Sequence, residues 1–301
     1  LLQDSPTSLP ILQGTFGLEH ESLRIDRQTN RLSQKPHPEK LGSRNFHPYI
    51  QTDYSEPQIE LITPIASSTK EARRFLTGIA DVAGRSLNKE DYLWPLSMPP
   101  QVSEEEIVIA QLEDDFERRY RQHLAKVYGK RLQTISGIHY NFGLGEELLT
   151  QLFQQSDYED LAAFKNDLYL KLAQNFIKYR WLLTYLYGAT PLAEKGFFDQ
   201  ELDGPLRSIR NSSLGYVNHD SVKVSYSSLE QYVEDIEACV ADGRLIAEKE
   251  FYSPVRLRGA KRSRDYLSQG ITYLEFRCFD IDPFDQQGIA QETLDTVHLL
   301  A

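Results

Sequence analysis

Four segments of the chain alternate apolar and polar residues with the two-residue period of a β-strand. They cover residues 15–25, 58–63, 133–142 and 271–279. In the first segment, Phe16 and Leu18 lie on one face, and Glu19 and Glu21 lie on the other. The pattern therefore predicts strands with one apolar face and one polar face.

The other three segments also carry ionisable side chains on the polar face. Glu60 lies on the second, His139 beside Asn141 on the third, and Glu275 beside Arg277 on the fourth. Charges on one open sheet face are usually solvated. If the four polar faces converge, however, the carboxylates would repel one another and raise each other's pKa unless a cation lay among them. We therefore expect a bound metal.

The candidate ligands are mainly oxygen donors, which suit magnesium, manganese or calcium better than zinc or copper. They are Glu19, Glu21, Asp53, Glu60, His139 and Glu275, with Asp53 in the turn-like stretch 51–57. A lone histidine in a strand is more often a core residue, so His139 is a candidate only because of the glutamates around it. The residues by themselves indicate an enzyme that binds a hard metal and a phosphate group.

Amphipathic helices are predicted between the strands. Ser68 with Glu71, and Ser227 with Glu230, have the spacing of capping boxes before apolar stripes. Residues 116–124 continue a helical stripe, and 161–186 reads as a long, strongly buried helix. No repeat or linker divides the chain.

Charge and cysteine content restrict the partners and the compartment. The formal charge of −11 makes nucleic acid a poor partner, although residues 256–264 could form a cationic wall for a small anionic substrate. Only two cysteines are present, which argues against a disulfide framework or a zinc site and favours the cytoplasm. No signal peptide or membrane-spanning run is visible. The sequence also lacks a phosphate-binding glycine motif and a nucleophile arrangement.

Read in order, seven stretches resemble the bacterial-type glutamate–cysteine ligase family, also called γ-glutamylcysteine synthetase. They are FGLEHESLRID (16–26), PHPEKLGSRNFHPYIQTDYSEPQIELITP (36–64), WPLSMPP (94–100), QTISGIHYNFGL (133–144), RSIRNSSLGYVN (207–218), EKEFYSPVRLR (248–258) and GITYLEFRCFDIDPF (270–284). The resemblance runs from end to end, and it is nearest to the N-terminal part of fused enzymes that also carry an ATP-grasp glutathione synthetase domain.

The resemblance implies an α+β, glutamine-synthetase-like fold, in which a curved, mostly antiparallel sheet forms a cup with helices packed outside. It places the family's metal ligands on the six residues named above. It places arginines that contact glutamate and phosphate on Arg210 and Arg277, with Arg256 as a further candidate. Residues expected around the incoming cysteine are Tyr54, Tyr120, Gln133, Tyr216 and Tyr252.

The implied reaction has two steps and uses Mg²⁺ or Mn²⁺, with ATP as co-substrate. The γ-carboxylate of L-glutamate attacks the γ-phosphate of ATP to give γ-glutamyl phosphate, and the amine of L-cysteine then displaces phosphate. Arg277, Glu275 and Arg210 are the expected catalytic residues. Neither step needs a nucleophile from the protein.

Two alternatives remain open at this point. A related ligase could join glutamate to another amine, or the fold could serve as a scaffold without catalysis. We expect residues 1–301 to form one ligase catalytic domain, truncated at both ends, with the ATP-grasp domain absent and a homodimer possible.

Overall fold

One sheet forms the centre of the computed structural model, which describes residues 13–200, 202–215 and 217–301. The strands are β1 Gly14–Asp26, β2 Ile50–Thr52, β3 Gln58–Ile62, β4 Asp91–Leu93, β5 Ile138–Leu144, β6 Val255–Arg258 and β7 Tyr273–Phe279. Their order is β2-β3-β1-β5-β7-β6, with β4 paired to β1 outside this path. All of these strand pairs are antiparallel. The predicted curved, mostly antiparallel sheet is confirmed.

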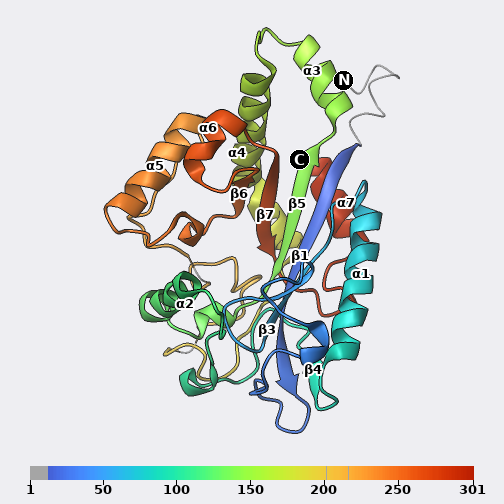
Figure 1. Cartoon of the computed structure of the whole chain (residues 1–301), viewed down its shortest axis with the longest axis vertical. Coiled ribbons are helices and arrows are strands. Elements are labelled where there is room, and N and C mark those ends of the chain that lie inside the picture. Colours follow the sequence, from blue (N-terminus) through green and yellow to red (C-terminus); the bar gives the residue numbers. More distant parts are fainter. Residues whose placement is uncertain (1–12, 201, 216) are drawn as a thin grey trace.

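Most of the described helices contribute buried residues to the core under the apolar face of this sheet (Figure 1). The helices are α1 Thr69–Ser86, α2 Asp115–Tyr128, α3 Glu146–Gln154, α4 Leu161–Tyr187, α5 Leu229–Ala241, α6 Tyr266–Gln269 and α7 Gln291–Leu300. Helix α1 packs on β1 and β3, and α4 packs on β6 and β7. Leu76 of α1, Phe176 of α4 and Leu294 of α7 belong to one buried cluster with the apolar side chains of the strands. None of the described helices is long and apolar enough to cross a membrane.

The strand register brings the polar residues of different strands opposite one another. Glu19 of β1 pairs with His139 of β5, and Glu21 pairs with Glu60 of β3. Their apolar neighbours Leu18 and Tyr140 also pair, and both are buried in the main cluster. Because side chains alternate between the faces of a sheet, this register gathers the acids on the face away from α1 and α4.

A β-bulge lies in β7 beside this polar face. Ile138 pairs with Phe279, but Tyr140 pairs with Phe276, so Arg277 and Cys278 together oppose the single residue between Ile138 and Tyr140. Strict alternation would put Phe279 on the face of Arg277. The bulge instead lets Phe279 enter the buried cluster while Arg277 stays on the polar face, as bulges near active sites often do.

Several predicted boundaries were wrong by a few residues. The third strand begins at Ile138, because Leu132–Thr134 forms a short 3₁₀ helix, and the fourth begins at Tyr273. Ser68 caps α1 as predicted, but the Glu71 carboxylate accepts the backbone N–H of Ser67 in place of that of Ser68.

The other two helix predictions need larger corrections. Helix α5 is capped by Ser228, whose hydroxyl accepts the N–H of Gln231, so the capping position is one residue later than Ser227. Helix α4 is less buried than its composition indicates, since Trp181 and Tyr185 are 62% and 67% exposed.

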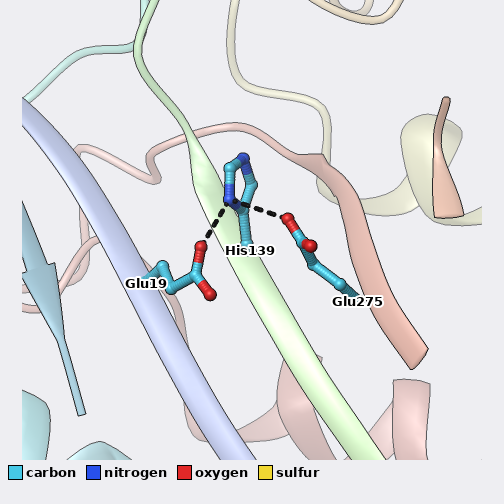
Figure 2. A group of neighbouring side chains, drawn as sticks. All are labelled: Glu19, His139 and Glu275. Carbon is cyan, nitrogen blue, oxygen red and sulfur yellow. Dashed lines mark hydrogen bonds and ion pairs between the residues drawn. The ribbon is translucent and has the colours of Figure 1, made fainter. Parts of the chain in front are cut away.

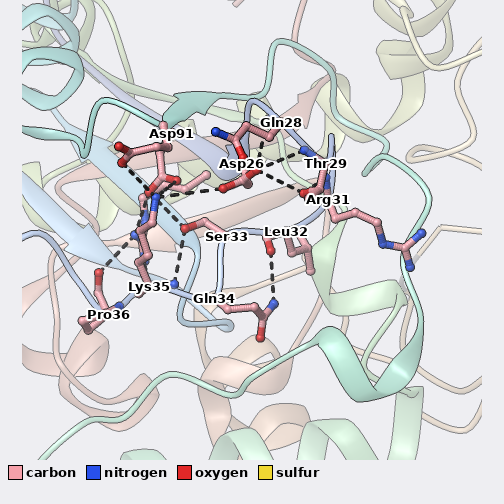
Figure 3. Close-up of polar contacts among 12 residues, drawn as sticks. Asp26, Gln28, Thr29, Arg31, Leu32, Ser33, Gln34, Lys35, Pro36 and Asp91 are labelled. Atoms are coloured by element: carbon pink, nitrogen blue, oxygen red, sulfur yellow. Dashed lines mark hydrogen bonds and ion pairs between the residues drawn. The ribbon is translucent and has the colours of Figure 1, made fainter.

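Buried ionic contacts attach the long connection between β1 and β2 to the sheet. Arg24 of β1 donates to the backbone oxygens of Lys35 and Pro36 and lies 3.7 Å from the carboxylate of Asp91. Ser33 and Lys35 donate to the same Asp91 side chain (Figure 3). Burial of a guanidinium and a carboxylate is tolerated only when both are hydrogen-bonded, so this network fixes the path of the connection.

A second buried pair lies beside it. The Glu56 carboxylate accepts two hydrogen bonds from Arg44, at 2.7 and 2.8 Å, and the backbone N–H groups of His37 and Gln111. Glu56 therefore attaches the β1–β2 connection and the segment of Gln111 to the turn that carries Asp53.

Candidate metal and substrate site

His139 stands at the centre of the polar face, between two carboxylates (Figure 2). Its Nδ1 lies 2.9 Å from Glu19 Oε2 and 3.4 Å from Glu275 Oε1. Asn141, two residues along β5, donates to the other oxygen of Glu19 at 2.9 Å. The three neighbouring strands β1, β5 and β7 thus supply one cluster, whose donor atoms lie within 4.8 Å of one another.

The other ring nitrogen of His139 faces a second group of carboxylates. Glu21, Glu60 and His139 also bring one donor atom each within 4.8 Å of one another. His139 Nε2 is buried, has no hydrogen-bond partner among the described atoms, and lies 3.5 Å from Glu21 Oε1. A neutral imidazole has only one ring nitrogen with a free lone pair. A neutral His139 can therefore ligate in only one of the two groups at a time.

The electrostatics of this face favour a cation. Burial of Glu60 is the main cause that raises its pKa well above the usual value. The negative charges of nearby acids raise it further; these are Glu19, Asp53, Glu21 and Glu275. Lost hydration and the charge of Glu21 raise the pKa of Asp53 to about 6. Burial and Glu275 also push the pKa of Glu19 upward, but the hydrogen bonds with His139 and Asn141 hold it below its usual value. Mutual repulsion among acids is what a hard divalent cation relieves, so the residues fit such an ion.

Glu275 differs from the other acids because two guanidinium groups bind it. Arg277 Nη1 donates to Oε1, and Arg258 Nε donates to Oε2. Burial opposes ionisation, but the charges of Arg277, Arg258, His139 and Arg256 together hold the pKa of Glu275 far below its usual value. Its ionised carboxylate therefore connects the acidic half of the face to an arginine-rich half.

The other predicted arginines contact the backbone of this half. Arg210 Nη1 donates to the carbonyl oxygen of Arg277 at 2.7 Å, and its guanidinium lies directly over Gly137. Arg256 is on the same face as Glu275, but its guanidinium bonds the carbonyl oxygens of Lys249 and Phe251.

The residues predicted around the incoming amine lie in a second apolar cluster, separate from the core under the sheet. Tyr54 and Tyr120 are buried in it, and Tyr252 packs against its rim, with its ring 5.4 Å from that of Tyr128. Tyr54 Oη and Gln133 Nε2 are buried and lack hydrogen-bond partners among the described residues. Buried polar atoms of this kind need a partner, which a polar ligand could supply. Tyr216 lies outside the described residues.

Comparison with known proteins identifies the chain's relatives. The sequence profile of the glutamate–cysteine ligase family matches residues 1–301. The chain belongs to the glutamate–cysteine ligase family. It is 66% identical over 299 residues to the glutathione biosynthesis bifunctional protein GshAB of Streptococcus agalactiae, covering 99% of this chain and 40% of that protein. The chain thus spans about two fifths of the length of the curated relatives it matches.

Solved structures of glutamate–cysteine ligase relatives have the same fold. A bifunctional glutathione synthetase from Pasteurella multocida superposes with a TM-score of 0.91 at 46% identity, covering 97% of this chain and 39% of that one. A glutamate–cysteine ligase from Francisella tularensis, in complex with AMP, gives 0.88 at 26% identity, covering 96% and 66%. The predicted family and fold are therefore confirmed.

Three residues of this ligase-family site were not singled out from the sequence. Asn141 holds Glu19, Gly137 donates its N–H to Glu21 and leaves room for Arg210, and Arg258 binds Glu275. Alternation placed Asn141 on the polar face without assigning it a contact, and Arg258 also lies on the polar face of its strand. Nothing in the sequence marks Gly137, because its role comes from a side chain distant along the chain.

Proposed function

We propose that this chain catalyses the ATP-dependent joining of the γ-carboxylate of glutamate to the amine of cysteine, the first step of glutathione biosynthesis. The observation that carries the proposal is the pair of ligand groups sharing His139, with Glu275 bound by two arginines, in a chain of the glutamate–cysteine ligase family. The Streptococcus agalactiae and Pasteurella multocida relatives, both named for glutathione biosynthesis, support it. They also support a second, fused catalytic region beside this one.

The proposed chemistry needs charge neutralisation and positioning in place of a protein nucleophile. Glutamate attacks the γ-phosphorus of ATP, forming γ-glutamyl phosphate and releasing ADP. The cysteine amine then attacks the acyl carbon, the C–O bond to phosphate breaks, and the amine loses a proton. Mg²⁺ or Mn²⁺, held by Glu19, Glu21, Asp53, Glu60, His139 and Glu275, would neutralise phosphate charge. Arg277 and Arg210 would bind the transferring phosphoryl group and hold it in line.

Recognition of the amine is proposed for the second apolar cluster. Tyr54, Tyr120 and Tyr252 give it aromatic walls, which suit a small, weakly polar thiol side chain. Gln133 Nε2 and Tyr54 Oη, which have no partner among the described residues, are suited to bind the carboxylate of the incoming amino acid.

The proposal is tested by measuring phosphate release from ATP in the presence of glutamate, Mg²⁺ and one amine at a time. The amines are cysteine, 2-aminobutyrate, alanine and ammonia. We expect cysteine to give the highest kcat/KM and γ-glutamylcysteine as the product. Equal rates with all amines would contradict the proposal that cysteine is the substrate and would indicate a ligase that acts on another amine. Absence of glutamate-dependent turnover in the protein expressed from its complete coding sequence would indicate a scaffold without catalysis.

Replacing Gly137 by Ala is expected to reduce kcat/KM about 10- to 100-fold with little loss of stability. A Cβ at this position would lie 2.2 Å from three atoms of the Arg210 guanidinium, which must move away. Steady-state kinetics and thermal unfolding measure the two effects. The matched control is Gly84→Ala on α1, where nothing lies within 4 Å of the new Cβ. Full activity of Gly137→Ala would show that the position of Arg210 is not critical.

A further inference from the structure

Arg258 contacts the site through Glu275 but has no role in the ligase mechanism proposed above. It ends β6, where Val255 and Leu257 point into the main core and Arg256 and Arg258 point to the polar face. Its Nε donates to Glu275 Oε2, the oxygen that Arg277 does not bind. Each oxygen of the buried Glu275 carboxylate therefore accepts a hydrogen bond from a different guanidinium group.

The other nitrogens of Arg258 are available for a ligand. Within the described part of the chain, Glu275 is its single hydrogen-bond partner, and 37% of its side chain is exposed. Arg256, on the same strand face, is bound to backbone carbonyl oxygens. Arg262 and Arg264 are 73% and 70% exposed and pair with Asp265 and Glu237 outside the site. Of the arginines in the cationic stretch 256–264, Arg258 is the one that bonds a carboxylate of the site and has no other hydrogen-bond partner among the described residues.

The charge around Arg258 indicates what it binds. Its Nε bonds Glu275, which belongs with Glu19 and His139 to the first ligand group. A guanidinium beside the ligands of a hard cation is suited to phosphate oxygens bound to that cation, which it can contact through two parallel N–H groups. Exposure of Arg258 to solvent gives a phosphate access to those groups.

We propose that Arg258 binds phosphate oxygens of the nucleotide through the guanidinium nitrogens that Glu275 does not occupy. The assignment rests on the proposed function, because it takes the nucleotide to be a substrate. It adds a third arginine to the phosphate-binding half of the site.

Binding measurements on Arg258→Gln separate this role from a structural one. Mn²⁺ alone, followed by electron paramagnetic resonance, is expected to bind at least as tightly as to the unaltered protein and up to about fivefold more tightly, because a positive charge beside the acids is removed. A non-hydrolysable ATP analogue with Mg²⁺, measured by calorimetry, is expected to bind about 10- to 100-fold more weakly. The KM for glutamate is expected to stay unchanged.

Two further variants complete the test. Arg258→Lys keeps the charge without the planar fork and is expected to recover part of the analogue affinity. Arg264→Gln, an exposed arginine outside the site, is expected to change neither affinity. Weaker binding of both Mn²⁺ and the analogue in Arg258→Gln would show a structural role and overturn the proposal. An increased KM for glutamate with unchanged analogue affinity would also overturn it, by assigning Arg258 to the glutamate carboxylate.

These readouts also separate failure of this proposal from failure of the proposed function. If the unaltered protein binds the analogue but releases no phosphate with glutamate, the ligase function fails, and the Arg258 assignment is decided by the binding data alone. If the unaltered protein binds no analogue, both proposals are overturned.

Discussion

The variant Glu60→Gln is expected to lose about 10²- to 10³-fold in kcat while unfolding at a higher temperature than the unaltered protein in the presence of a chelator. The carboxylate of Glu60 has no hydrogen bond within the described part of the structure, and burial together with the charges of four other carboxylates raises its pKa. Removing its charge relieves that repulsion, with an expected gain of about 1 kcal/mol in the free energy of unfolding. Catalysis suffers because a proposed metal ligand is lost, and metal ions supply several kcal/mol of charge stabilisation.

The raised pKa of Glu60 also determines how the stability of the folded protein changes with pH. Since the pKa of Glu60 is higher in the folded than in the unfolded chain, the folded state holds more protons and the unaltered protein loses stability as the pH rises from about 4.5 through the raised pKa. The stabilisation by Glu60→Gln should therefore grow over that range. Thermal unfolding with chelator at several pH values measures it. The control is Glu234→Gln, an exposed acid on α5. A destabilised Glu60→Gln would contradict the repulsion described above.

The variant Glu56→Gln is expected to lower the free energy of unfolding by about 3 kcal/mol, which corresponds to a decrease of roughly 5–10 °C in Tm. Its carboxylate is buried and accepts two hydrogen bonds from Arg44 and one each from two backbone N–H groups. A glutamine cannot accept all four and leaves the Arg44 charge without its partner. Chemical denaturation followed by circular dichroism measures the loss.

A pH titration of stability gives a second test of the same pair. Burial raises the pKa of Glu56, but hydrogen bonds from Arg44 and backbone groups outweigh it and hold the pKa below its usual value. Its contribution is therefore complete above about pH 4.5 and lost as the pH falls below that value. The control is Asp81→Asn, whose exposed pair with Arg85 should be worth less than about 1 kcal/mol. Equal losses in both variants would refute the assigned role of Glu56.

The sequence was sufficient to predict which residues lie on the same face of the sheet. The structure places them on that face, as the alternation of apolar and polar residues predicts. Glu19, Glu21, Glu60, His139 and Glu275 all lie on the polar face, because the period of two is a local property of each strand. The inference of a hard metal site needed only this pattern and the oxygen-rich set of side chains.

The pairing between strands could not be predicted in the same way. That Glu19 meets His139 depends on register, and the position of Arg277 relative to Phe279 depends on a bulge, neither of which local periodicity contains. The Glu56–Arg44 pair was missed for a similar reason, since a buried carboxylate in a turn looks like a solvated one until its partner is known. Arg258 was seen as part of a cationic stretch, whose outer members the structure leaves in solvent.

The strand order has a consequence for synthesis on the ribosome. Glu21, Glu60 and His139 belong to β1, β3 and β5, which leave the ribosome well before β6 and β7. At elongation rates of about 5–20 residues per second, many seconds separate the emergence of Glu21 from that of Arg277. During this time the nascent chain carries acids without the arginines that later balance them. The ligand group of Glu21, Glu60 and His139 is therefore synthesised first, and β7, which lies between β5 and β6 in the sheet and carries Glu275 and Arg277, is synthesised last of the strands.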